Sequence, residues 1–377
     1  MLSFLPAPVR GTLAALLLVL NTLVHAPILF VFALIKLIPI PALRTWCTRV
    51  MISVAEFWMR CNSGWMALSG NIRWDIEGRE RLDYNGWYLV TSNHQSWVDI
   101  LALQHVLNRH MPMLKFFLKQ ELIWVPIIGL CWWALDFPFM KRYTKAYLAK
   151  HPEKAGQDLA TTRKACEKFK TTPVAVFNFL EGTRLTPAKH QQQQSPFTYL
   201  LKPKSGGVAF VLDAMGEQLR SLLDITIHYP DGNPSFWDLL CGKVRHVVMH
   251  LELKPIPAEF IGRNYQEDEA FRAEFQAWVT QLWLDKDAHM ARLGIERDIR
   301  LEVPHFVAVG HILQRTDLLA TVPERFAECC VQPFGLVALP HPVQLPEIDI
   351  NLFWHAKYHR DSANRWLRQL MFELFAD

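Results

Sequence analysis

The feature that most constrains this chain is a run of apolar residues near its start. From Gly11 to Ile35 there is no Lys, Arg, Asp or Glu. A helix needs about 20 apolar residues to cross a bilayer, so the run is long enough to do so. It is too long for a secretory signal peptide, and no small-residue cleavage site precedes a polar mature start. The sequence therefore predicts membrane attachment, with a buried core helix as the alternative.

Pro27 divides this run. The run is therefore expected to form either one kinked span or two half-length helices that enter and leave the same leaflet. Arg10 precedes the run, whereas Lys36, Arg44 and Arg49 follow it. The excess of basic residues after the run favours a cytoplasmic location for the rest of the chain. We expect a membrane protein, in the inner membrane if the cell is bacterial, with its active site facing the cytoplasm.

Composition excludes several classes of function. The 377 residues are enough for two domains or for one large domain with appendages, and a hydrophobic content of 51% can form a sizeable core. The formal net charge of +4 is too small to predict a nucleic-acid partner. The seven cysteines have no C-x-x-C spacing, so neither a zinc site nor a redox dithiol is expected. Their odd number is typical of reduced thiols in a cytoplasmic compartment.

Strand-like and helix-like segments alternate along the middle of the chain. Strands are predicted over 71–76, 87–91, 174–179, 222–229 and 244–253, and helices over 45–66, 97–107 and 150–170. This alternation predicts an α/β fold with a mostly parallel sheet flanked by helices. Open sheets of this kind usually place reactive groups at the carboxyl ends of their strands.

The segment Asn93-His94-Gln95-Ser96-Trp97-Val98-Asp99 follows one of these strands. It places an imidazole and a carboxylate five positions apart. An imidazole held by a carboxylate can remove a proton from a hydroxyl near neutral pH. On its own the pair is a weak signal, because such residues also cap helices. Glu181-Gly182-Thr183-Arg184 stands at the end of another strand, on the same expected edge, and strengthens the catalytic interpretation.

These blocks, in this order over residues 70–255, resemble the glycerophospholipid acyltransferase family, best known from the PlsC-type lysophosphatidate acyltransferases. The resemblance implies that His94 is the general base and that Asp99 orients its ring. It also implies membrane lipid as a partner, a lysophospholipid acceptor and acyl-CoA or acyl carrier protein as donor. The thioester is already activated, so no cofactor or metal is expected. Backbone amides of the His94 turn or the Gly182 loop are candidate donors to the tetrahedral oxyanion.

The resemblance also assigns phosphate-binding residues. Arg142, which follows Phe139-Met140-Lys141, matches the second block of the family. Arg184 offers a planar fork of donors suited to phosphate. These basic residues also fit a rim that snorkels to headgroups, and the lysines around 202–204 fit solvated charges before a helix. The full set of expected phosphate-binding residues is Arg142, Glu181, Gly182, Thr183, Arg184 and Lys204.

Two further features concern the acceptor and the type of catalysis. The segment Asp224-Ile225-Thr226-Ile227-His228-Tyr229-Pro230 departs from the family's usual proline-containing strand. This form is closer to acyltransferases that act on lysophosphatidylinositol or lysocardiolipin. We expect 1-acyl-sn-glycerol-3-phosphate as acceptor and phosphatidate as product, with those lysophospholipids, or a catalytically silent lipid-binding protein, as alternatives. A covalent acyl-enzyme is not expected, because no Ser or Cys stands in a nucleophile-elbow motif.

Beyond residue 300 the sequence changes character. Residues 301–306, 321–325 and 354–367 resemble the end of a LysR-type regulator's effector-binding domain. No winged helix-turn-helix accompanies them, so DNA binding does not follow. Asp361 and Ser362 are expected to cap a last helix that carries an apolar stripe.

The sequence thus predicts three parts. Residues 1–69 are a membrane-anchoring helical segment, 70–299 an acyltransferase domain, and 300–377 a small α/β extension. We interpret the extension as a fusion remnant that packs poorly or docks on the enzyme. A ligand-sensing regulator is the alternative that this extension suggests.

Overall fold

The computed structural model describes residues 2–140, 169, 172–293 and 301–375, apart from 117, 217, 220, 266, 302, 304 and 341–351. The chain divides into two compact units, Met1–Glu296 and Arg297–Asp377. The predicted helix over 150–170 falls almost entirely outside the described residues.

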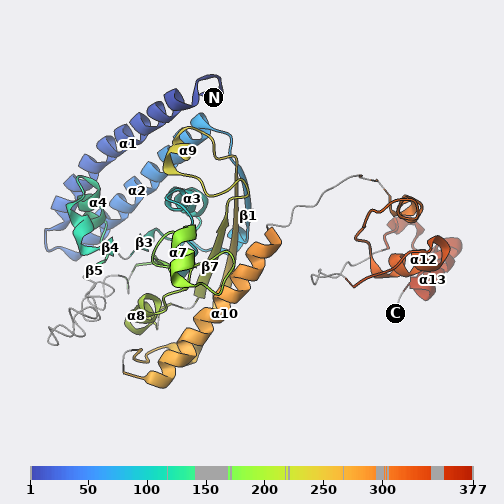
Figure 1. Ribbon diagram of the computed structural model, residues 1–377. Coiled ribbons are helices and arrows are strands. Elements are labelled where there is room, and N and C mark those ends of the chain that lie inside the picture. Colours follow the sequence, from blue (N-terminus) through green and yellow to red (C-terminus); the bar gives the residue numbers. More distant parts are fainter. Residues whose placement is uncertain are drawn as a thin grey trace. The chain divides into compact units, whose positions relative to one another are not determined.

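The first unit is built on a six-stranded sheet with the order β1-β8-β7-β2-β6-β3 (Figure 1). All neighbouring strands are parallel except β7 and β8, so the predicted α/β fold with a mostly parallel sheet is confirmed. A separate two-stranded ladder pairs β4 (Leu118–Lys119) with β5 (Phe139–Met140). The strands of the main sheet are β1 (Arg73–Glu77), β2 (Trp87–Ser92), β3 (Leu114–Phe116), β6 (Val174–Phe179), β7 (Ser221–His228) and β8 (His246–Pro255).

Helices cover both faces of this sheet. Successive strand residues point to opposite faces, so Leu222 joins one core and Leu223 the other. The first core packs against α8 (Gly206–Met215) and α10 (Glu269–Leu293), and the second against α3 (Val98–Leu107) and α9 (Phe236–Leu240). Because both faces are buried, the central strands are almost continuously apolar.

The amino-terminal residues form two long helices. α1 (Ala7–Lys36) is one continuous helix that contains Pro27, so the predicted pair of half-length helices is wrong. α2 (Pro41–Ser69) packs along α1 and supplies the contacts that keep the helix intact at Pro27. The amide of Asn21 bonds the side chain of Asn62 at 2.8 Å and the carbonyl of Trp58 at 3.0 Å.

Much of the outer surface of these helices is apolar. α1 is long and apolar enough to cross a membrane, by length and composition. α4 (Ile128–Ala134) packs on α1 through a shared apolar cluster and adds further exposed residues. We call the following side chains the apolar surface: Leu16, Leu20, Leu23, Val31 and Leu34 of α1, Trp46 and Phe57 of α2, and Trp124, Leu130 and Trp133 in and before α4.

The second unit is helical in its described residues. It contains α11 (Val309–Leu313), α12 (Glu324–Phe334) and α13 (Ser362–Phe375), with short 3-10 turns at Phe306–Ala308 and Ala356–Tyr358. The strands predicted here are not found among those residues, which offer no neighbouring strand to pair with. The predicted cap is present, because the Asn364 amide donates to Asp361 Oδ1 at 2.8 Å.

Candidate active site

The predicted site residues gather where three neighbouring strands end. Ser92, the last residue of β2, pairs with Phe179 of β6 on one side and with Ile225 of β7 on the other. The turn that carries His94 therefore lies between the residues that follow β6 and the end of β7. Asn93 fixes this turn to β7: its side-chain amide exchanges two hydrogen bonds of 2.8 Å with the backbone of Ile227.

His94 and Asp99 are in direct contact. His94 Nδ1 lies 2.8 Å from Asp99 Oδ2, and the carboxylate is completely buried. The same oxygen accepts the backbone amides of Gln95 at 2.7 Å and Ser96 at 2.9 Å. One carboxylate thus closes the turn and orients the ring. It leaves Nε2 as the ring nitrogen available to a substrate.

Tyr229 is a third member of this group that sequence reasoning missed. Its hydroxyl donates to Asp99 Oδ1 at 2.7 Å, and the side chain is buried. Burial first, and then the nearby Asp99 carboxylate, raises the pKa of Tyr229 well above its usual range. The phenol therefore remains a donor across the physiological pH range. The signal in the sequence was the position of Tyr229 at the end of the strand predicted over 222–229.

The His94 ring lies flat against Phe179. Their centroids are 3.8 Å apart, with 13° between the planes, and the His94 side chain is 12% exposed. The His94 carbonyl also accepts the amide of Leu185 at 2.7 Å. The imidazole is thus held on one face by an aromatic ring and at Nδ1 by a carboxylate, while a small part of it reaches solvent.

Glu181 supports the His94 turn from the protein interior. It is fully buried, and its two oxygens accept the backbone amides of His94 and Leu201, each at 3.1 Å. Burial raises its pKa to about 8. Glu181 was predicted among the phosphate-binding residues, and this placement contradicts that role. A fully buried side chain whose two oxygens both accept backbone amides has no access to a phosphate.

The other residues of the third block stand closer to the surface. Gly182 has φ +66°, which favours glycine. A Cβ there would come within 3.2 Å of Lys204 Nζ, so the Lys204 ammonium lies beside the Gly182 backbone. The Arg184 guanidinium lies 4.3 Å from the centre of the Trp97 ring, where a cation is favoured. Lys204 and Arg184 thus flank the loop after β6.

Two predicted residues need separate comment. Thr183 Oγ1 accepts a hydrogen bond from Lys189 Nζ at 2.7 Å. Lys189 belongs to α7 (Pro187–Gln193) and is a further cation beside this loop, which was not among the predicted site residues. Arg142 lies outside the described residues. Among the described residues, no group of three or more His, Cys, Asp or Glu side chains is placed to hold a metal ion.

Four of the backbone amides in the two loops expected to bind an oxyanion are already engaged. Those of Gln95 and Ser96 donate to Asp99, that of His94 donates to Glu181, and that of Gly182 donates to the Phe179 carbonyl. These hydrogen bonds hold the His94 turn and the Gly182 loop in place instead. Ser96 Oγ donates to the Pro234 carbonyl and accepts the Val98 amide, so it has a structural role as well.

A buried ion pair lies behind the site. Lys286 of α10 and Asp224 of β7 are 3.0 Å apart, with 0% and 5% of their side chains exposed. Lys286 Nζ also donates to the Ile225 carbonyl at 2.7 Å, and the Thr91 hydroxyl donates to Asp224 Oδ1 at 2.8 Å. Burial lowers the pKa of Lys286. The pair joins α10 to the two central strands just before the His94 turn.

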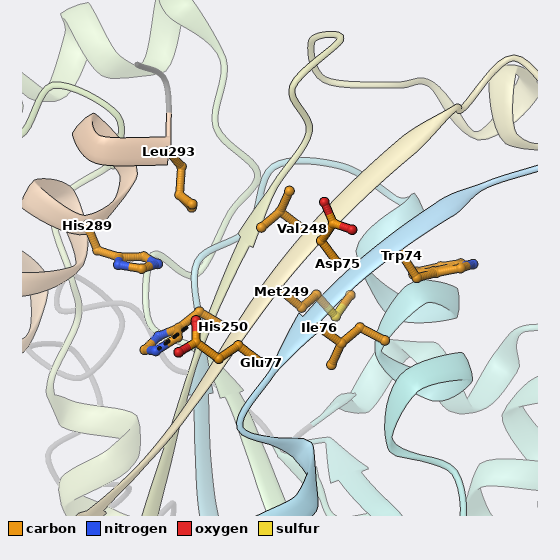
Figure 2. Close-up of a pocket in the computed structure, with 9 residues that line it drawn as sticks. All are labelled: Trp74, Asp75, Ile76, Glu77, Val248, Met249, His250, His289 and Leu293. Atoms are coloured by element: carbon orange, nitrogen blue, oxygen red, sulfur yellow. Dashed lines mark ion pairs between the residues drawn. The ribbon is translucent and has the colours of Figure 1, made fainter. Parts of the chain in front are cut away.

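Figure 2 shows a pocket of about 420 Å³ at the β1 edge of the sheet, which contains none of the predicted site residues. His250 Nε2 lies 3.9 Å from Glu77 Oε2, and the His250 and His289 rings are 4.5 Å apart. Burial, and then His250, lowers the pKa of His289 to about 4. The lining residues are Trp74, Asp75, Ile76, Glu77, Val248, Met249, His250, His289 and Leu293.

Parts of the chain are similar to known proteins. Residues 73–229 match the family described as Acyltransferase. The chain is 26% identical to bovine 1-acyl-sn-glycerol-3-phosphate acyltransferase delta over 209 residues, half of this chain and 52% of the relative. It is 26% identical to the mouse gamma protein over 216 residues, 53% of this chain and 51% of the relative. The PlsC acyltransferase of Thermotoga maritima, a solved structure, aligns with 73% of this chain and 97% of its own at 16% identity, with a TM-score of 0.42.

A different set of relatives is similar to another part of the chain. The transcriptional activator NahR of Pseudomonas putida is 79% identical over 91 residues, 24% of this chain and 30% of the activator. The activator NagR of a Ralstonia species is 62% identical over the same length. The LysR-type resemblance of the carboxyl-terminal extension is thereby confirmed.

The chain spans about half the length of the acyltransferases that it matches and about a third of the activators. The matched region 73–229 contains His94, Asp99, Glu181, Arg184 and Tyr229, which the fold brings to one edge of the sheet. Residues 73–229 thus match the family described as Acyltransferase, and this stretch carries the residues that gather at the edge of the sheet.

Proposed function

We propose that this chain is a membrane-attached O-acyltransferase. It would transfer a fatty acyl group from acyl-CoA to 1-acyl-sn-glycerol-3-phosphate and so form phosphatidate. The observation that carries the proposal is the contact between His94 and a buried Asp99, on an edge that also presents Arg184 and Lys204. The acceptor is supported by the names of the acyltransferase relatives, which act on 1-acyl-sn-glycerol-3-phosphate.

The reaction follows from these groups. His94 Nε2 takes the proton of the acceptor hydroxyl as its oxygen attacks the thioester carbonyl carbon. The resulting tetrahedral intermediate breaks its carbon–sulfur bond, and the thiolate leaves with the proton from the imidazolium. Asp99 stabilises that imidazolium through Nδ1, while Tyr229 and the turn amides hold Asp99 in place. No bond to the protein forms at any step.

The phosphate of the acceptor would be held by the basic residues beside the loop after β6. Arg184 is positioned by its contact with Trp97, and Lys204 lies against Gly182. A guanidinium can bind two phosphate oxygens at once, and an ammonium adds a compact charge. Together they would place the free hydroxyl of the acceptor near His94, and such positioning contributes much of an enzyme's rate.

Membrane attachment would come from the apolar surface. Its side chains include Leu34 of α1 and Trp124, which ends the 3-10 helix just before α4; they are 67% and 84% exposed. Exposed apolar area of this extent is unusual on a water-soluble surface and typical of a membrane contact. Replacing Trp124 and Trp133 by Ser should shift the protein from membranes towards the soluble fraction. An unchanged distribution would count against the contribution of α4.

Activity on a panel of lysophospholipids tests the function. Membranes containing the protein are incubated with labelled acyl-CoA and each lysophospholipid, and the products are identified. His94→Ala should lower kcat by about 10²–10⁴-fold, the usual contribution of a general base. His305→Ala removes an exposed histidine of the second unit and serves as the matched control. Full activity in His94→Ala would refute the proposed base, and product from lysophosphatidylinositol or lysocardiolipin alone would reassign the acceptor.

A further inference from the structure

A second pocket lies between α2 and α3. Its volume is about 500 Å³, and it takes residues from α2, from α3 and from the turn that follows α3. His94 and Asp99 stand at the start of α3, whereas this pocket is at its end, about 15 Å away along a ten-residue helix. The pocket is therefore separate from the site described above. It is lined by Arg60, Ser63, His105, Asn108, Arg109 and His110.

The lining of the pocket is basic. It has two guanidinium groups and two imidazoles, and none of its six lining residues is acidic. Burial, and then the charge of Arg79, lowers the pKa of both His105 and His110, so at pH 7 these rings are neutral and able to donate one hydrogen bond each. The positive charge therefore comes from the arginines.

Glu56 is the acidic group next to the pocket. Its Oε2 lies 3.9 Å from Arg109 Nε, and its Oε1 accepts the hydroxyl of Tyr84. The Arg109 side chain is 62% exposed, and an ion pair this long and this exposed is weak. Arg109 is thus left able to bind another anion, and Arg60 adds a second charge on the same side.

Two details of the pocket lower the stability of the folded chain when nothing is bound. Arg109 has φ +64°, in the left-handed region that is strained for a residue with a Cβ. Asn108 donates to the Glu56 carbonyl at 3.0 Å, while its Oδ1 is buried and has no partner among the described residues. A bound molecule with an anionic group would pair with the two guanidiniums of the pocket.

The position of the pocket indicates where such a molecule would come from. Phe57 belongs to the apolar surface, is 54% exposed and precedes Arg60 by three residues, so the two lie on the same face of α2. Its ring also contacts His25 of α1, at 5.5 Å between centroids. The pocket therefore borders the apolar surface. Phosphate groups lie at that level when such a surface enters a bilayer.

We propose that this pocket binds the phosphate of an anionic glycerophospholipid that is not the reacting substrate. Arg60 and Arg109 hold the phosphate. The proposal rests on the membrane attachment inferred above, and on no feature of the acyl-transfer step. Free inorganic phosphate offers the same charge, and the experiment separates the two sources.

The test measures binding of the full-length protein to vesicles of phosphatidylcholine with and without phosphatidylglycerol, a lipid that is not the expected product. We expect Arg60→Gln/Arg109→Gln to weaken binding to the anionic vesicles by about 25-fold, the factor for two basic residues at an anionic surface. Arg81→Gln removes a 70% exposed arginine outside the pocket and should have a much smaller effect. His94→Ala should bind like the unmodified protein, which separates this proposal from the acyl-transfer chemistry.

Three outcomes would overturn the proposal. The double variant could bind as the unmodified protein does, or Arg81→Gln could weaken binding equally, which would show general surface attraction. Inorganic phosphate could displace the protein from the vesicles at low concentration, which would assign the pocket to a soluble anion. Folding is checked with Arg109→Gly, which suits the left-handed backbone. Its thermal midpoint should be unchanged or higher while its vesicle binding falls.

Discussion

Replacing Tyr229 by Phe tests how the base is tuned. Asp99 accepts four hydrogen bonds, from Tyr229, His94 and the amides of Gln95 and Ser96. The substitution removes one of them and leaves the ring in place. A hydrogen bond to a charged group contributes about 1.5–3 kcal/mol, so the free energy of unfolding should fall by roughly that amount. The carboxylate then has one donor fewer and binds the imidazolium more strongly.

The kinetic consequence is a shift in the pH–rate profile. A base that holds its proton more strongly becomes active only at higher pH, so the midpoint of the acidic limb of kcat should rise by about one unit, equivalent to about 1.4 kcal/mol. Release of free thiol from acyl-CoA, followed between pH 5 and 9 in detergent micelles, measures this. Tyr88→Phe is the matched control, because it removes a buried hydroxyl that accepts the Asp83 amide and does not contact Asp99. A loss of stability without any shift in the midpoint would show that Tyr229 only packs.

Other substitutions test the support of the site and the role of the second unit. Lys286→Met should lower the free energy of unfolding by about 3–5 kcal/mol, because it leaves the Asp224 carboxylate buried and unpaired. Lys286→Met/Asp224→Asn should recover most of this in chemical denaturation, and a double variant as unstable as the single one would contradict the reasoning. Glu181 has a pKa raised from 4.5 to about 8, so the folded state keeps a proton that the unfolded state loses. Its contribution to stability should be complete below about pH 4.5 and be lost as the pH rises through about 8. Thermal midpoints of Glu181→Gln should therefore vary less over this range than those of the unmodified protein. Truncation after Arg297 should leave acyl transfer intact, and its loss in a well-expressed truncated protein would contradict a dispensable second unit.

The sheet was predictable because its central strands are buried on both faces. The predicted strand over 87–91 is β2 (Trp87–Ser92), and the one over 174–179 is β6 with the same limits. The His94–Asp99 contact was predictable as well, because a five-residue spacing across a turn into a helix brings the two side chains together.

Long-range partners carry no local signal. Tyr229 is 130 positions from Asp99, and Glu181 is 87 positions from the His94 amide that it accepts. Lys286 sits on a helix whose sequence gives no hint that one lysine faces inward against Asp224. The sequence left two forms open at Pro27, one kinked span or two half-length helices, and the structure has a single helix there.

The Asp99 carboxylate both orients the His94 ring and holds the turn and β7 together. The oxygen that aligns His94 also closes the turn through two amides, and the other oxygen is reached only when β7 has docked beside β2. An incompletely assembled sheet therefore has no aligned His94 ring. For the same reason the length of this turn is constrained, because an inserted residue would separate His94 from the carboxylate that closes the turn.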